Sequence, residues 1–280
     1  MRAESRFAQL GQIRMHYWDW GGTGQPVLFV HANGFHGAVW SPIAEALLPE
    51  YRSIAVDVRG HGDSDKPDQG YEWTQLASDI GELLHALDVR DAVGIGHSLG
   101  GGLTVICAAL YPGAISRAVL IDPVITSGPP TSEGVPINPL AEAARKRRHR
   151  WASKREAFEH LRTRATFAGW REDVLWLYVD YGLRDSPEGG VELKCSGEIE
   201  ARIFEETARS PAFSMLGALE GHSLILLGEA SYVGEAIARG AAGRMRSVEL
   251  DYVPGTTHFL VMERPDDVAS RIRAFLEQRV

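Results

Sequence analysis

The sequence predicts an α/β fold in which helices cover both faces of a mostly parallel sheet. Apolar, β-branched runs at 26–32, 53–58, 92–98 and 117–122 are nearly continuous, as in strands buried on both faces. Segments with the spacing of helices separate these runs, and regular alternation of strand and helix is typical of a doubly wound sheet.

The elements before residue 123 follow this rhythm. Residues 7–21 alternate in polarity and turn at Gly11, which predicts an antiparallel hairpin. Residues 74–88 predict a helix, because their apolar side chains recur at three- and four-residue spacing. Residues 99–113 are apolar on most faces and predict a helix buried in the centre of the fold.

A long insertion then interrupts the pattern. It begins as a loop rich in Pro and Gly and continues as charged helical segments with many aromatic residues. Its length of about 95 residues is well beyond that of an ordinary loop. Strands return at 222–230 and 246–255. We therefore expect a core domain of residues 1–123 and 221–280, and a helical cap of residues 124–220.

Composition narrows the class of protein. The 280 residues, 44% of them hydrophobic, can bury a large core, and the net charge of -8 argues against general binding to nucleic acid. No segment approaches the ~18 apolar residues of a membrane helix, and the first residues lack the features of a signal peptide. Two cysteines, Cys107 and Cys195, form no disulfide framework and no metal-ligand spacing. We expect a cytoplasmic protein without a metal or cofactor, and we leave open a homodimer.

The segment Gly96-His97-Ser98-Leu99-Gly100 lies between a predicted buried strand and a predicted helix. A turn this sharp needs small residues at its glycines, because a Cβ would crowd the neighbouring backbone. The turn lifts the serine hydroxyl off the sheet, at the positive end of the following helix. The simpler alternative is a glycine-rich connection without chemistry. The flanking pattern favours Ser98 as a nucleophile.

Four motifs in order carry a resemblance to a known family: residues 29–35, 57–64, 96–101 and 255–259. The chain resembles the α/β-hydrolase superfamily over nearly its whole length outside the insertion. The resemblance implies a mostly parallel eight-stranded sheet flanked by helices, with a helical cap where the insertion lies. It also implies a serine nucleophile, and residues 57–64 as a structural loop.

The resemblance assigns further roles at the site. A serine hydroxyl needs a base, and His258 matches it, in the loop after the last strand. The backbone N–H groups of Leu99 and Asn33 match the oxyanion hole, with the Asn33 side chain as an additional donor. Phe35 and His97 are candidates for substrate contact, although His97 lies inside the turn and is expected to point away from the pocket.

The carboxylate that should orient the histidine is missing from its usual place. The family pattern puts it where this sequence has Ser231 or Tyr232. Asp122, at the end of an earlier strand, is the favoured replacement. Glu229 is a second candidate, and a protein without a functional acid is a third. Asp251 lies inside a strand, too early to reach the pocket.

Residues 144–150 form a dense basic run in an acidic protein. A solvated helix face explains such a run most simply, and attraction of anionic substrates or phospholipid head groups is the alternative. The aromatic residues that follow are expected to build the core of the cap, and some could line an apolar cleft against the sheet.

These observations predict a serine hydrolase that cleaves an apolar carboxylic ester, such as a lipid or aromatic ester, through an acyl-enzyme. Hydrolysis of a carbon–carbon bond in a diketone is an alternative reaction. A ligand-binding homologue without catalysis is an alternative of another class. A serine at position 98 argues against epoxide hydrolase or dehalogenase chemistry, for which the resemblance would require an aspartate.

Overall fold

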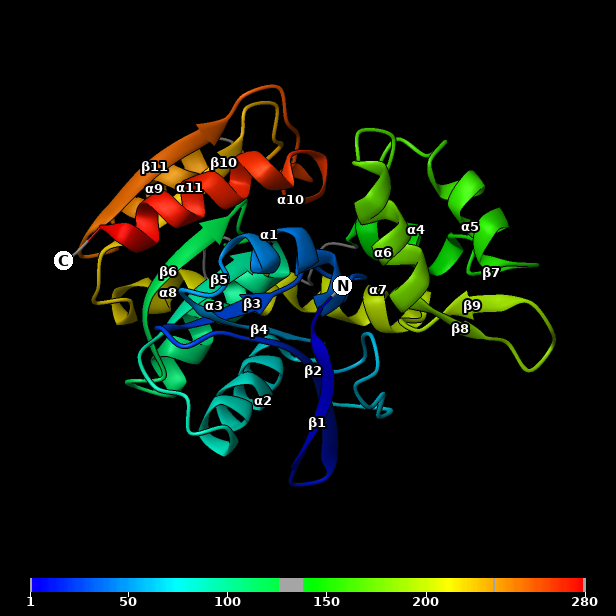
Figure 1. The fold of residues 1–280 in the computed structure, drawn as a ribbon, viewed down its shortest axis with the longest axis horizontal. Coiled ribbons are helices and arrows are strands. Elements are labelled where there is room, and N and C mark those ends of the chain that lie inside the picture. Colours follow the sequence, from blue (N-terminus) through cyan, green and yellow to red (C-terminus); the bar gives the residue numbers. More distant parts are fainter. Residues whose placement is uncertain (1, 126–137, 234, 279–280) are drawn as a thin grey trace.

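A computed structural model describes residues 2–125, 138–233 and 235–278. Its centre is an eight-stranded sheet in the order β1-β2-β4-β3-β5-β6-β10-β11 (Figure 1). The strands are β1 (Glu4–Leu10), β2 (Ile13–Gly21), β3 (Pro26–Val30), β4 (Arg52–Val56), β5 (Ala92–His97), β6 (Ile115–Ile121), β10 (Ser223–Gly228) and β11 (Val248–Val253).

Strand direction follows the predicted pattern. The hairpin β1–β2 is antiparallel and joins β4 in an antiparallel pair, whereas every pair from β4 to β11 is parallel. The predicted mostly parallel sheet is confirmed. In a parallel sheet the carboxyl ends of the strands meet at one edge, so the loops after β3, β5, β6 and β10 gather there.

Alternate residues of each central strand enter two separate apolar cores. In β3, Val27 and Phe29 face the core that holds α1 (Ser41–Ala46) and α11 (Pro265–Glu277). Leu28 and Val30 face the core that holds α2 (Trp73–Ala86) and α3 (Leu99–Leu110). Burial on both faces explains why these strands are apolar at nearly every position.

Two short helices, α9 (Glu235–Ala242) and α10 (Leu260–Glu263), and the 3-10 helix η1 (Gly37–Trp40) lie in the residue ranges expected for the core. The end of the insertion holds α8 (Ala212–Met215) and the 3-10 helices η2 (Glu206–Arg209) and η3 (Leu216–Ala218), and α8 and η3 pack against α3. The closing helix α11 begins at Pro265, with two aspartates in its first turn, as its sequence predicts. No helix in the described ranges is long and apolar enough to cross a membrane.

The insertion contains α4 (Pro139–Lys146), α5 (Lys154–Leu161), α6 (Glu172–Gly182) and α7 (Gly197–Glu205). Figure 1 shows α4, α5 and α6 grouped on one side of the molecule, away from α2. The insertion also holds a small antiparallel sheet of β7 (Arg150–Trp151), β8 (Leu183–Asp185) and β9 (Val191–Leu193). This sheet was not expected, because strands of two or three residues carry no readable alternation. Most of the expected loop after Asp122, residues 126–137, lies outside the described ranges.

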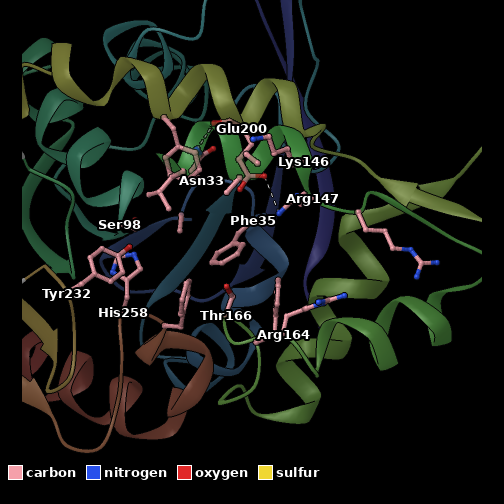
Figure 2. Close-up of a pocket in the computed structure, with 18 of the residues that line it drawn as sticks. Asn33, Phe35, Ser98, Lys146, Arg147, Arg164, Thr166, Glu200, Tyr232 and His258 are labelled. Atoms are coloured by element: carbon pink, nitrogen blue, oxygen red, sulfur yellow. Dashed lines mark hydrogen bonds and ion pairs between the residues drawn. The ribbon is translucent and has the colours of Figure 1, made fainter. Parts of the chain in front are cut away.

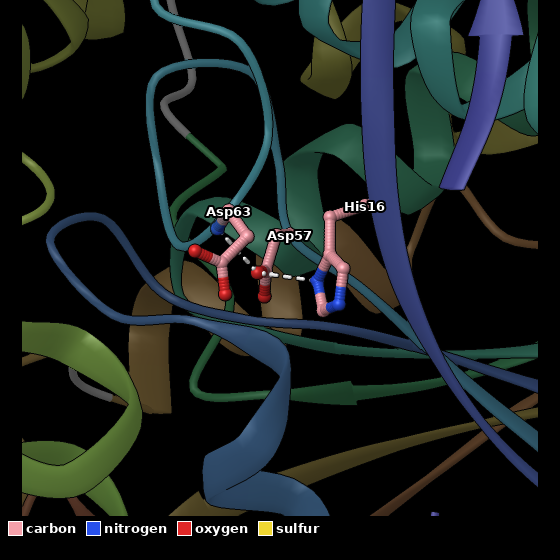
Figure 3. A group of neighbouring side chains, drawn as sticks. All are labelled: His16, Asp57 and Asp63. Atoms are coloured by element: carbon pink, nitrogen blue, oxygen red, sulfur yellow. Dashed lines mark hydrogen bonds and ion pairs between the residues drawn. The ribbon is translucent and has the colours of Figure 1, made fainter. Parts of the chain in front are cut away.

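Asp57 is buried beneath the hairpin and connects three segments of the core domain (Figure 3). Its carboxylate lies 2.7 Å from His16 Nδ1 and accepts from the backbone N–H groups of Gly37 and Asp63. His16, Asp57 and Asp63 lie close enough together to hold a metal ion, but Asp63 is paired with Lys194. Donors already occupy the oxygens of Asp57, so we interpret this cluster as structural.

Burial alone would raise the pKa of Asp57, but the hydrogen bond and charge of His16, with smaller effects from His36 and His31, hold that pKa well below its usual range. A carboxyl with a lowered pKa stabilises the folded state above its unfolded pKa of about 3.9, and this contribution is lost as the pH falls toward the folded pKa.

We therefore predict that Asp57→Asn lowers the free energy of unfolding at pH 7 by about 3–5 kcal/mol, because it breaks a buried pair. The difference from the natural protein should shrink as the pH falls below about 4, where Asp57 becomes protonated in the unfolded chain. Urea denaturation at a series of pH values measures both effects. Asp63→Asn, at a more exposed ion pair, is the control and should change stability by less than about 1 kcal/mol. A difference that stays constant across this pH range would contradict the prediction.

Candidate active site

Ser98 occupies a strained turn between β5 and α3. Its φ of 56° and ψ of -115° are rare for a residue with a Cβ. Its backbone N–H donates to Ile121 O at 3.0 Å. A Cβ on Gly96 would lie 2.3 Å from Gly100 O, and one on Gly100 would lie 2.1 Å from Val30 O. Both positions therefore require glycine, as the sequence analysis expected.

His258 lies in the loop between β11 and α10, and its side chain is buried. The loop passes so close to β10 that a Cβ on Gly228 would lie 2.1 Å from Thr257 O. The Nε2 of His97 lies 2.8 Å from the carbonyl oxygen of His258 and can donate to it. His97 is absent from the cavity described below, so the geometry gives no support to the expected substrate contact of this residue.

Asp122 follows β6 and reaches His258 from the neighbouring strand end. Its Oδ2 lies 3.4 Å from His258 Nδ1, which is an ion-pair distance without the alignment of a hydrogen bond. Neither of its carboxylate oxygens has a hydrogen-bond partner in the described part of the chain, and the side chain is fully buried. Asp122 also has a positive φ of 40°, unusual for a residue other than glycine. Strain and unpaired oxygens are typical of functional sites.

The other acidic candidates are engaged elsewhere. The Glu229 carboxylate accepts from Gly255 N–H at 2.9 Å. Asp251 lies in β11, as expected, and pairs with Arg271 at 2.9 Å. Of the carboxylates that the structure describes, Asp122 is the one within ion-pair distance of His258.

Tyr232, which stands where the family carries its acid, covers the ring of His258. The two ring centroids lie 4.5 Å apart, with 34° between the planes. In the sequence, Tyr232 stands out only as a position without the expected acid. Its place against the histidine depends on how the loop after β10 folds, and no sequence signal indicates it.

Ser98, His258 and Tyr232 line a cavity of about 540 Å³. Figure 2 shows these three side chains on one side of the cavity and basic side chains on the other, with Phe35 between them. Phe35 therefore lies where the sequence analysis expected a substrate contact. The basic residues that line the cavity are Lys146, Arg147, Arg148 and Arg164. Aromatic side chains complete the wall: Phe35, Phe167, Phe204 and Phe259.

The basic run of residues 144–150 has features of both a solvated helix face and a surface that attracts anionic ligands. Most of its cations form ion pairs near the surface, as in a solvated face: Arg145 with Glu198 and Glu205, Lys146 with Glu142, Arg148 with Glu156, and Arg150 with Glu188 and Glu192. Yet the end of α4 turns part of the same run toward the cavity. The run itself was visible in the sequence, but Arg164 and the acidic Glu200 in the cavity wall were not identified.

Asn33 also lines the cavity, in the loop after β3. Its side-chain Nδ2 donates to the backbone carbonyl of Glu200 at 2.9 Å. One of the two N–H donors of the side chain is therefore engaged with α7. Leu99 begins α3 and is buried directly beside Ser98.

Known proteins resemble this chain over almost its full length. A 2-(acetamidomethylene)succinate hydrolase from Mesorhizobium japonicum is 28% identical over 98% of this chain and 95% of its own. A non-heme haloperoxidase from Rhodococcus erythropolis is 26% identical over 93% of this chain and 95% of its own. The crystal structure of an E-2-(acetamidomethylene)succinate hydrolase superposes with a TM-score of 0.84 and 26% identity, covering 99% of this chain and 100% of that one.

The family model described as "Alpha/beta hydrolase family" matches residues 27–271, which is most of the chain. The match, the sheet order and the strained turn at Ser98 agree with the resemblance seen in the sequence. This chain therefore belongs to the alpha/beta hydrolase family.

Proposed function

We propose that this protein is a serine hydrolase that attacks a carbonyl carbon in a small substrate bearing one or more carboxylates. The observation that carries the proposal is the division of the cavity. Ser98 and His258 lie on one side, and Lys146, Arg147 and Arg164 lie on the other (Figure 2). A cationic wall favours an anionic ligand, and charge-assisted hydrogen bonds to carboxylate would fix its orientation.

The proposed reaction follows from the residues at the nucleophile. The Ser98 hydroxyl oxygen bonds to the carbonyl carbon while His258 accepts the hydroxyl proton. The backbone N–H groups of Leu99 and Asn33 stabilise the oxyanion, and Asp122 orients His258 and balances its positive charge. His258 then gives the proton to the leaving group. Water, deprotonated by His258, attacks the acyl-enzyme and releases the acid, and the proton returns to Ser98.

The bond that breaks is proposed to be other than an ester. The relatives that span the chain favour this alternative over the apolar ester expected first, because one is named for an acetamido-substituted succinate and the other is named a haloperoxidase. The cavity adds a physical reason: its wall carries Lys146, Arg147 and Arg164, and an apolar ester would offer none of these cations a charge-assisted hydrogen bond. An amide and the carbon–carbon bond of a diketone acid both satisfy these conditions.

We predict that Asp122→Asn lowers kcat by about 10²- to 10⁴-fold, because His258 loses both its orientation and its countercharge. Thermal unfolding should be close to that of the natural protein. Glu229→Gln is the matched control, since Glu229 bonds to a loop backbone and not to His258. Activity of Asp122→Asn within threefold of the natural protein would remove Asp122 from this role.

A second prediction concerns the substrate. A fluorophosphonate probe should label Ser98, and Ser98→Ala should abolish the label.

The substrate preference is tested with a series of compounds. N-acetylaspartate, a dioxo acid and a monoester of succinic acid carry a carboxylate, and the neutral ester 4-nitrophenyl butyrate does not. The non-ester acids should give higher kcat/KM than the neutral ester after correction for leaving-group reactivity. Absence of labelling in the folded protein would favour the ligand-binding alternative, and a preference for the neutral ester would contradict the anionic substrate.

A further inference from the structure

One of the cations in the cavity wall differs from the others in its surroundings. Arg147 is paired with Glu200, whose side chain is only 10% exposed, at 3.1 Å from Nη1 to Oε2. Lys146 and Arg148 are paired with carboxylates that are about half exposed. Exposed pairs of that kind contribute little, whereas a buried pair strongly affects what a site can bind.

The pairing of Arg147 is incomplete. The Nε and Nη2 atoms are buried and have no hydrogen-bond partner in the described ranges, and Glu200 Oε2 lacks the alignment of a hydrogen bond. The Tyr178 hydroxyl donates to Gly34 O, and its oxygen also interacts with the guanidinium. A guanidinium has five N–H groups, and a planar bidentate carboxylate is the ligand that best satisfies them. The contacts of Arg147 with Glu200 and Tyr178 therefore leave Nε and Nη2 unpaired.

Glu200 sits between this guanidinium and the loop that follows β3. Its Oε1 would lie 2.8 Å from a Cβ on Gly34, so the carboxylate packs directly on that glycine. Its backbone carbonyl accepts from the Asn33 side chain. Burial raises the pKa of Glu200, and the charge of Arg147 opposes that rise. The charge of Arg147 is therefore the influence that favours the anionic form of Glu200.

We propose that Glu200 is a built-in counter-ion that occupies Arg147 in the empty cavity, and that a carboxylate of the substrate displaces it. The inference rests on the proposed function, since it names the residue that takes the substrate's carboxylate. Arg147 gains a partner with better geometry, and Glu200 stays on the Gly34 loop. The pair lowers the positive charge that the empty cavity presents, at the expense of affinity for the anion.

This arrangement predicts effects of opposite sign. Arg147→Gln removes the cation and should weaken succinate binding by at least tenfold. Glu200→Gln removes the competitor and should strengthen it by about threefold to tenfold. A pair with only a structural role would give losses in both variants. Arg147→Lys keeps the positive charge but loses the bidentate geometry of the guanidinium. Its succinate affinity should lie between those of the natural protein and Arg147→Gln.

The experiment is calorimetric titration of the full chain with succinate and, as a neutral probe, with succinamide. Succinamide binding should be the same in all variants. Arg145→Gln is the matched control, because Arg145 pairs with Glu198 and Glu205 and does not line the cavity. Thermal unfolding of each variant checks that it is folded.

Fluorophosphonate labelling of Ser98 in the same samples separates the two proposals. Labelling together with weaker succinate binding in Glu200→Gln would overturn the counter-ion role and leave the hydrolase intact. Labelling together with unchanged binding in Arg147→Gln would overturn the carboxylate site. Loss of labelling in the natural protein would instead overturn the proposed function.

Discussion

A single residue, Ser98, separates the end of strand β5 from the start of helix α3. The chain reverses direction at this residue, and the positions of the candidate reacting groups depend on the reversal. Ser98 takes up the change of direction with a positive φ, and the backbones of the two elements approach within contact distance at Gly96 and Gly100. The Ser98 N–H is held by the end of β6, so the serine is fixed to the sheet on one side and exposed to the cavity on the other. A side chain at either glycine would force the helix away and move the hydroxyl.

The parallel sheet explains how a carboxylate that follows β6 can lie beside His258. Strands β6 and β10 are neighbours in parallel register, so their carboxyl ends lie side by side at the edge where His258 stands. Asp122 N–H donates to Leu226 O, a direct link between these two strands. A carboxylate after β6 can therefore approach the same histidine as one after β10. Tyr232, in the loop after β10, packs its ring against the ring of that histidine.

The insertion supplies what the sheet edge lacks, which is a charged wall. Helices α4 and α7 pack together and bring Arg147 and Glu200 to the loop after β3. That loop also carries the candidate oxyanion donor Asn33, whose side chain is bonded to α7. The region that would select the substrate is thus physically connected to the region that would stabilise the reaction. A change in one is expected to affect the other.

Local pattern predicted the sheet and the turn at Ser98, because buried strands are apolar at nearly every position and a tight turn demands glycine. The resemblance to the family, and not local pattern, pointed to His258. It also narrowed the acid to Asp122 and two alternatives. The tertiary structure brought Asp122 to 3.4 Å from His258 and paired Arg147 with Glu200. These contacts join residues far apart in the chain, and charge patterns along a sequence do not specify which distant partner a side chain meets.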